Sequence, residues 1–285
     1  MAEPARRAPA PGDSELSSDD PYRYGWGLRP VRLPDGRVEM RETPLTPKDI
    51  LDPQVGDHLT QSLWHGMYVG PLFTLILDYF KLFPDVVVGM DFKILWGIPG
   101  LSEPSPDIVV IRGVRDKEAY RRSFAVREEG ARPCLVVEVV SDDPVVRSLD
   151  HNEKVDIYES AGVQEYLILD PPPVTRDGRF QMTRYRLDAR GRYQLAKPDH
   201  GGFLSKTTGL WFGITPDGQE LYLVDAATGE RLEMLSEAKA RAAYEAERRR
   251  AAEARADYEA QTRRQLEAEN TRLREELERL KRTGD

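Results

Sequence analysis

The stretch Arg132-Pro-Cys-Leu-Val-Val-Glu138-Val-Val-Ser141 decides the fold class. Its run of valines and leucine is typical of a strand buried in the middle of a sheet. Strand alternation puts Glu138 on the same face as Val136 and Val140, so a carboxylate interrupts an apolar face. Such a carboxylate loses several kcal/mol of solvation unless it is paired or binds a metal. We interpret Glu138 as functional, the alternatives being a wet edge strand or a salt bridge to an arginine.

A second short run, Ile108–Ile111, also predicts a buried central strand, and Pro106-Asp107 directly precedes it. Taken alone, Asp107 could equally be a turn residue or a helix cap, because Pro-Asp is a common turn pair. Together with Glu138, Asp107 becomes a candidate metal ligand. Carboxylates on neighbouring strands can hold Mg²⁺, which takes oxygen ligands, activates water and stabilises charge on a phosphate under attack.

Lys154 lies in a predicted helix, Asp150–Ala161, that ends at Gly162. A lysine on such a helix is normally solvated, and Asp150 could form an ordinary salt bridge with it at i, i+4 spacing. In a metal site, however, its ammonium would stabilise the negative transition state and help to deprotonate the attacking water.

His65 lies in the region Leu59–Phe83, where apolar residues recur at helical spacing. Pro71 within this region should kink one helix or divide it into two. One interpretation of His65 is a histidine that is packed in the core or faces solvent. The other is a functional group near the metal, which supports the metal ligands or contacts a phosphate.

The remaining segments complete the predicted fold class. Strands are expected before and after the two central ones, followed by two hairpins near the end of the domain. Their order predicts an α/β fold with a mixed sheet. The expected strands are Val86–Val88, Phe92–Trp96 and Glu165–Leu169, and the expected hairpins are Met182–Leu187 with Tyr193–Leu195 and Leu221–Val224 with Arg231–Leu232.

Composition divides the chain of 285 residues into three parts. Residues 1–45 are predicted to be a disordered leader and a loosely packed arm, residues 46–235 the core domain, and residues 236–285 a long helix. No apolar run approaches the ~20 residues of a membrane span, and the start is not a secretory signal. The single cysteine, Cys134, excludes an internal disulfide framework and a cysteine-based zinc site. We expect a cytoplasmic protein without membrane contact.

The final helix carries a heptad pattern at Leu266, Asn270, Leu273, Leu277 and Leu280. Leucines at d positions with an asparagine at an a position favour a parallel coiled-coil homodimer. The alternative is a single exposed helix without a partner, since the pattern is strong only over the last two heptads.

The motifs together resemble the Uma2 family of restriction endonucleases, within the PD-(D/E)XK nuclease superfamily. The matching pieces lie within roughly residues 46–230 and are Pro106–Val110, Arg132–Ser141, Asp150–Tyr158 and Gly162–Pro171. The resemblance implies a restriction-endonuclease-like mixed sheet flanked by helices, and a metal-dependent nuclease.

The resemblance also implies residue roles. Asp107, Glu138 and the backbone carbonyl of Val139 would ligate Mg²⁺ or Mn²⁺, Lys154 would be the catalytic lysine, and His65 matches a histidine that the family often carries. One position departs from the superfamily pattern: the lysine normally follows the second acid by two residues, where this chain has Val140. The lysine would then have migrated to the helix.

The sequence leaves three functions open. The first is a Mg²⁺-dependent DNA endonuclease, and the second is a catalytically inactive nuclease fold that binds nucleic acid or protein and acts through its coiled coil. Residues 46–235 hold 21 basic and 29 acidic residues, so their net charge of −8 slightly favours the second. The third, a structural adaptor, leaves Glu138 unexplained. No P-loop, dinucleotide or Gly-x-Ser-x-Gly motif is present.

Overall fold

The computed structural model describes residues 20–197 and 201–234, together with residues 244, 247–250, 255, 259 and 263–264. The chain divides into two compact units, residues 1–232 and residues 233–285. Within the described residues, no helix combines the length and apolar character needed to cross a membrane.

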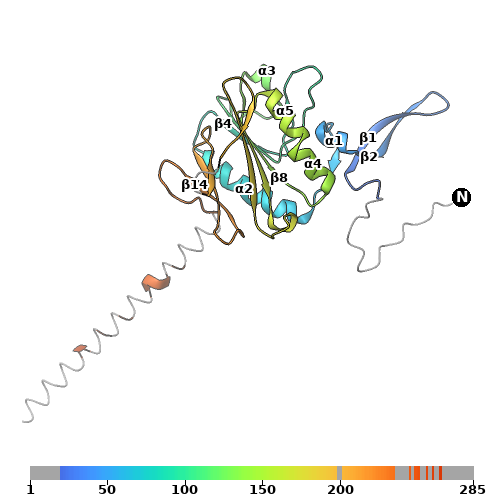
Figure 1. The fold of residues 1–285 in the computed structure, drawn as a ribbon. Helices are drawn as coiled ribbons and strands as arrows, with labels where there is room; N and C mark the ends of the chain where they lie inside the picture. Colours follow the sequence, from blue (N-terminus) through green and yellow to red (C-terminus); the bar gives the residue numbers. More distant parts are fainter. Residues whose placement is uncertain are drawn as a thin grey trace, which may run out of the picture. The chain divides into compact units, whose positions relative to one another are not determined.

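A six-stranded sheet forms the centre of the first unit (Figure 1). Its strand order is β11-β10-β9-β8-β6-β4, with β8 and β9 parallel and every other neighbouring pair antiparallel. The predicted mixed α/β class is therefore confirmed. The strands are β4 (Val86–Met90), β6 (Ile108–Arg112), β8 (Arg132–Val139), β9 (Glu165–Asp170), β10 (Gln181–Leu187) and β11 (Tyr193–Leu195).

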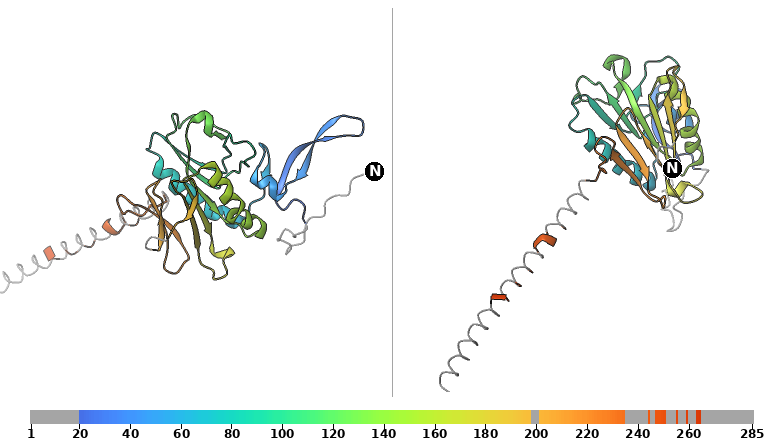
Figure 2. Two further views of the ribbon diagram at one scale, coloured as in Figure 1. Left: turned by 45° about the horizontal axis from the view of Figure 1, so that its top comes forward. Right: turned by 60° about the vertical axis from the view of Figure 1, so that its left-hand side comes forward.

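Helices cover both faces of this sheet (Figures 1 and 2). Helix α2 (Leu63–Phe80) packs Val69, Leu72 and Ile76 into one apolar cluster, which also holds Leu135 and Val137 of β8. Helices α4 (Pro144–His151) and α5 (Glu153–Ala161) form the crossover from β8 to β9 and cover the other face of the sheet. Residues from α5 share the second apolar cluster with the alternate residues of β8. The centre of β8 is buried on both faces, as its apolar run predicts.

Two predicted helical regions differ in detail from the structure. Pro71 does not end α2, which runs as a single helix through it. The predicted helix Asp150–Ala161 was wrong at its start, because α4 begins earlier, at Pro144, where the Asp143 side chain accepts hydrogen bonds from two backbone amides. The chain then breaks at Asn152, whose backbone leaves the helical region and whose side chain binds Ser148 of the preceding turn.

A three-stranded antiparallel sheet packs against the same apolar cluster as α2. Phe203, Phe212 and Leu223 bury their side chains there. The predicted hairpin of Leu221–Val224 with Arg231–Leu232 is reduced to one bridge between Val224 and Arg231, since the main partner of this strand is a preceding strand that the pattern missed. The strands of this sheet are β12 (Gly202–Leu204), β13 (Leu210–Ile214) and β14 (Leu221–Asp225).

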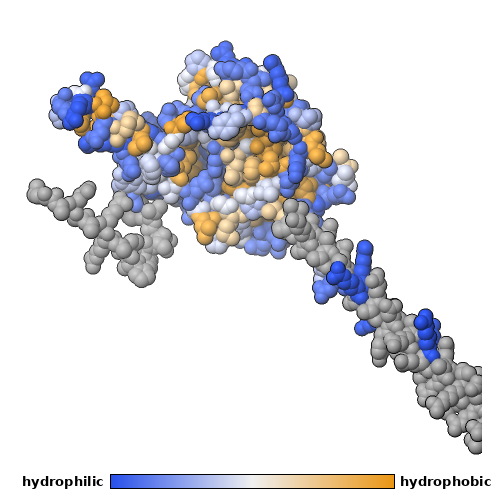
Figure 3. All heavy atoms as spheres, turned by 180° about the vertical axis from the view of Figure 1, so that it is seen from behind, coloured by the Kyte–Doolittle hydropathy of each residue, from blue (hydrophilic) through white to orange (hydrophobic). Residues whose placement is uncertain are grey.

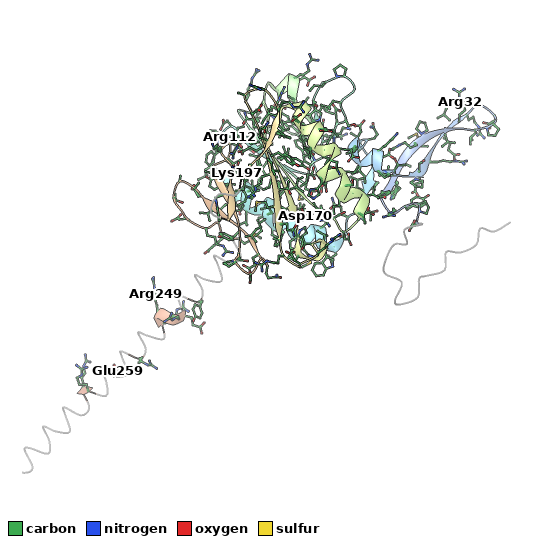
Figure 4. All side chains as sticks on the ribbon, viewed as in Figure 1. Arg32, Arg112, Asp170, Lys197, Arg249 and Glu259 are labelled. Carbon is green, nitrogen blue, oxygen red and sulfur yellow. The ribbon has the colours of Figure 1, made fainter. Side chains whose placement is uncertain are left out.

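The N-terminal arm is a two-stranded ribbon, β1 (Gly25–Arg32) and β2 (Val38–Pro44), extended at its base by β3 (His58–Leu59). The ribbon projects from the domain, with Arg32 near its far end (Figures 1 and 4). Leu28, Val38 and Met40 of the ribbon are exposed, and the space-filling view shows hydrophobic surface on it (Figure 3). The short elements α1 (Pro47–Leu51), β5 (Ile94–Leu95), β7 (Phe124–Ala125), α3 (Val126–Glu129) and the 3-10 turn η1 (Pro172–Val174) complete the unit.

The predicted leader, residues 1–19, and the heptad positions from Leu266 to Leu280 lie outside the described residues. Within the predicted tail helix, residues 244, 247–250, 255, 259 and 263–264 are α-helical.

Candidate active site

The antiparallel pairing of β6 and β8 brings Asp107 and Glu138 to the same end of these two central strands. Ile108 pairs with Val137, so the residue before β6 lies beside the residue near the end of β8. The Asp107 amide donates to Glu138 Oε2 at 3.3 Å, and the Val139 amide donates to Asp107 Oδ2 at 2.7 Å. The two carboxylates are thus fixed by backbone groups of each other's strand.

Helix α5 adds a cation and a phenol to this pair. Lys154 Nζ lies 3.0 Å from Glu138 Oε1 and 2.8 Å from Asp150 Oδ1. The Tyr158 hydroxyl donates to Glu138 Oε1 at 2.6 Å. Lys154 and Tyr158 are four residues apart, so helical periodicity puts both side chains on the face that meets β8.

Helix α2 contributes His65 from its first turn. Ser62 caps this helix by accepting a hydrogen bond from the His65 amide at 3.2 Å. The imidazole Nε2 lies 3.1 Å from Asp107 Oδ1, and Nδ1 is buried without a hydrogen-bond partner among the described residues. The structure thus brings together all four side chains singled out in the sequence: Asp107, Glu138, Lys154 and His65.

Burial makes this cluster electrostatically unusual. Glu138 is 1% exposed and Lys154 is 5% exposed. Burial raises the pKa of Glu138 to about 8, and the neighbouring carboxylates add to the rise while Lys154 opposes it. Burial alone would lower the pKa of Lys154, but the surrounding carboxylates outweigh it and raise that pKa. The ammonium is therefore held in its charged form.

The pKa of Asp107 shifts in the opposite sense to that of Glu138, because Asp107 is paired with His65. Burial is the largest single effect and disfavours the charged form of both Asp107 and His65, but their hydrogen bond together with the neighbouring charges outweighs it. The pKa of Asp107 is lowered and the pKa of His65 is raised. Asp107 is thereby kept as a carboxylate, while burial makes Glu138 the harder carboxyl to ionise despite its contact with Lys154.

Sequence reasoning missed two contributors to the site and underrated a third. Tyr158 appeared only as part of a motif, although its i+4 spacing from Lys154 could have placed it at Glu138. Asp150 is buried rather than part of a surface salt bridge. Asp91 follows β4 as an exposed residue, and the partial desolvation of its carboxyl together with the charge of Asp107 raises its pKa. Its amide donates to the Asp107 carbonyl at 3.3 Å, a contact that no local sequence signal predicts.

The donor chemistry of this cluster fits a hard divalent cation. A carboxylate offers about four lone-pair sites. Asp107 uses two of these for its contacts and Glu138 uses three, so both retain capacity for a further ligand contact. Among the described residues, no group of three or more His, Cys, Asp or Glu forms a metal cage. Two carboxylates with water completing the shell is the pattern that Mg²⁺ commonly adopts.

The fold and the site define a mixed α/β protein in which Asp107, Glu138, Lys154 and His65 lie together at one end of the central strands β6 and β8. A family model described as "Uma2: Putative restriction endonuclease" matches residues 60–216, more than half of the chain. The chain belongs to the Uma2 family, and this confirms the resemblance found in its motifs. Its family thus links it to nuclease chemistry.

No curated protein matches the chain in sequence. Among solved structures, the chain is similar to a "putative nuclease belonging to DUF820" from Anabaena variabilis ATCC 29413. The identity is 13%, the TM-score is 0.35, and the similarity covers 59% of this chain and 76% of that one.

Proposed function

We propose that this chain is a metal-dependent DNA endonuclease that hydrolyses phosphodiester bonds with Mg²⁺ or Mn²⁺. The observation that carries the proposal is the buried Glu138 carboxylate near the end of the central strand β8. It forms hydrogen bonds with the Asp107 amide and the Tyr158 hydroxyl, and an ion pair with Lys154. Burying three carboxylates, with Asp150 as the third, against one ammonium is costly in a purely structural cluster. A binding site for a cation and a phosphate explains why the cost is tolerated.

The proposal gives each side chain a role. Asp107 and Glu138 would hold the cation, with the Val139 backbone carbonyl as a further ligand, and a cation bound there supplies activated water and charge stabilisation. Lys154 would stabilise negative charge on the phosphate, because its contacts with two carboxylates keep its proton in place. This makes it a fixed cation rather than the base that removes a proton from water.

His65 would orient Asp107. Its Nε2 contact with Oδ1 leaves Oδ2 to the Val139 amide, so both oxygens of Asp107 are held in place. His65 therefore acts through Asp107 as a positioning residue.

Cleavage assays test the proposal directly. Native protein, Glu138→Ala and Lys154→Ala are incubated with plasmid and single-stranded DNA in Mg²⁺ or Mn²⁺, with Glu118→Ala as an exposed acidic control outside the site. We expect cleavage by the native and control proteins and a loss of about 100-fold or more in both site variants. Metal-dependent cleavage that survives Glu138→Ala would refute the assignment.

One observation favours a second function, a catalytically inactive binding protein. Every carboxylate oxygen of Asp107 and Glu138 already has a protein partner, so the network can exist without a metal. In this case the chain would bind nucleic acid or protein and work through its C-terminal helix. Failure of native protein to cleave any DNA or to bind Mn²⁺ would favour this function.

The proposed assembly is a cytoplasmic homodimer joined by a coiled coil of residues 236–285. Its support is the leucine and asparagine spacing of the sequence. Sedimentation of the full chain and of Leu273→Lys tests it: the native protein should sediment as a dimer and the variant as a monomer.

A further inference from the structure

A pocket of about 150 Å³ opens beside the acid cluster. The first turn of α2, the loop after β8 and the proline segment after β9 line it. Trp64 and His65 come from the first, Ser141 and Asp142 from the second, and Pro171 from the third. His65 connects the pocket to the candidate site, because the same imidazole contacts Asp107 at 3.1 Å.

The position of this pocket matters because the charged side chains of the site are themselves buried. A substrate strand that reaches Asp107 and Glu138 must pass exposed groups next to them. The pocket walls include exposed groups that are directly connected to the site through His65.

Trp64 is the notable wall residue. It is 54% exposed, although an indole is among the side chains that gain most from burial. Its neighbours Leu63 and Met67 are also exposed, so the first turn of α2 presents an apolar surface to solvent. Proline rings and Val174 form the other apolar part of the lining. A flat aromatic ring can lie against such walls.

The size and polar groups of the pocket narrow its occupant. The pocket is open and partly polar, and its volume of about 150 Å³ matches that of an engineered apolar cavity that holds one benzene ring. A ring of that size, rather than a fused pair, corresponds to a pyrimidine. Ser141 can donate and accept hydrogen bonds, and Asp142 can accept from an amino or imino group on the ring edge. All four bases present such groups on their pairing edges, so the volume of the pocket, and not its polar groups, selects a single-ring pyrimidine.

We propose that this pocket binds a single unpaired pyrimidine base of the substrate strand, stacked on Trp64. The proposal rests on the nuclease function and deepens it by naming the substrate class. A base paired in a duplex has its edge covered and its faces stacked, so the pocket requires a single strand or a nucleotide turned out of the helix.

Binding measurements test the base pocket without cleavage. Fluorescence anisotropy of the full-length protein compares labelled dT12, dA12, a 12-residue abasic strand and a 12-bp duplex. The assays use EDTA and, separately, Ca²⁺, a hard cation that takes oxygen ligands. We expect dT12 to bind more tightly than the other three. Equal binding of the abasic strand would overturn the stacking, and equal binding of dA12 would overturn the pyrimidine assignment.

Substitution of Trp64 supplies the residue-level test. Base stacking on an aromatic side chain predicts that Trp64→Ala weakens dT12 binding roughly 5- to 140-fold while leaving the abasic strand unaffected. Trp64→Phe should retain most of the affinity. Tyr120→Ala, at an 87% exposed aromatic residue away from the pocket, is the matched control and should bind dT12 like native protein. Native affinity for dT12 in Trp64→Ala would overturn the proposal.

Failure of this proposal differs from failure of the nuclease function. If native protein cleaves DNA with Mg²⁺ or Mn²⁺ but Trp64→Ala binds dT12 normally, the nuclease stands and the base pocket falls. If no DNA is cleaved but dT12 binding depends on Trp64, the pocket stands and catalysis falls.

Discussion

Glu138 is a buried carboxyl whose cost in stability the proposed function would explain. It is buried in the central strand, and its contacts to Lys154 and Tyr158 compensate for part of its lost hydration. Removal of one partner leaves the other charge uncompensated, whereas removal of both charges together relieves the problem. The cluster should therefore behave as a coupled unit.

Lys154→Met tests this coupling. The variant keeps the side-chain volume but leaves Glu138 and Asp150 without an ammonium, so we expect unfolding free energy to fall by about 3–5 kcal/mol. Urea denaturation in EDTA measures the loss, with exposed Lys48→Met as the control. The double variant Lys154→Met/Glu138→Gln should recover part of the lost stability, and strictly additive effects would contradict the coupling.

The raised pKa of Glu138 gives a second prediction at the same residue. A carboxyl with a pKa of about 8 in the folded protein and an ordinary value when unfolded binds more protons in the folded state. Its contribution to stability is present at low pH and is lost as pH rises through about 8. In EDTA, Glu138→Gln should therefore gain stability relative to native protein as pH rises from about 5 to 8.

Metal addition should restore the stability that the native protein loses relative to Glu138→Gln as pH rises. A cation that binds only the folded protein stabilises it, so Mn²⁺ should raise the Tm of native protein at pH 8 more than that of Glu138→Gln. Equal Tm shifts in both proteins would place the bound metal elsewhere.

At the scale of elements, the buried Glu165 at the start of β9 links the six-stranded sheet to the sheet of β12, β13 and β14. It accepts hydrogen bonds from Ser205 Oγ at 2.5 Å, Thr207 Oγ1 at 2.7 Å and the Lys206 amide at 3.0 Å. Arg186 of β10 donates to the same carboxylate at 2.9 Å. One side chain thus fastens the turn between β12 and β13 to the central sheet.

Glu165→Ala should accordingly destabilise the fold by about 3 kcal/mol or more, because several buried donors lose their acceptor. Urea unfolding monitored by tryptophan fluorescence measures the change, and Trp211 on β13 reports on the small sheet. Glu118→Ala provides an exposed control with little effect. A cost below about 1 kcal/mol would show that the contacts do not hold the sheets together.

Element-level patterns also decide what could be predicted from sequence. The apolar runs of β6 and β8 predicted buried central strands, since only such strands are apolar on both faces. Strand β12 was missed because it has only three residues, and Gly202 and Gly213 interrupt the hydrophobic signal of β12 and β13. The attachment of this sheet to the central sheet depends on the Glu165 contacts, which join residues 40 and more positions apart.

The candidate site was predictable where its residues belong to regular elements. Asp107, Glu138 and Lys154 each lie in or beside a strand or helix with a clear pattern, and the sheet register brings the first two together. Asp91 lies at a turn with a positive φ of 48°, outside any periodic segment. Its place beside Asp107 depends on tertiary packing, so local pattern analysis could not find it.

At the scale of the whole molecule, net charge argues for an unusual mode of DNA binding. The chain carries a formal charge of −8, with no excess of basic residues to neutralise a long run of phosphates. Affinity for a single strand should then come from base stacking on Trp64 and from a few phosphate contacts near the metal. This differs from a basic groove, which binds by releasing many counterions.

The salt dependence of dT12 binding measures that difference. Each phosphate contact with a single strand contributes about −0.7 to the slope of log affinity against log salt concentration. We expect about three contacts or fewer, and hence a slope no steeper than about −2 between 50 and 200 mM salt. Trp64→Ala should lower the affinity at every salt concentration while keeping the same slope, because stacking releases no counterions. A slope steep enough for six or more phosphates would instead require an extended basic surface and would assign binding to charge rather than to the pocket.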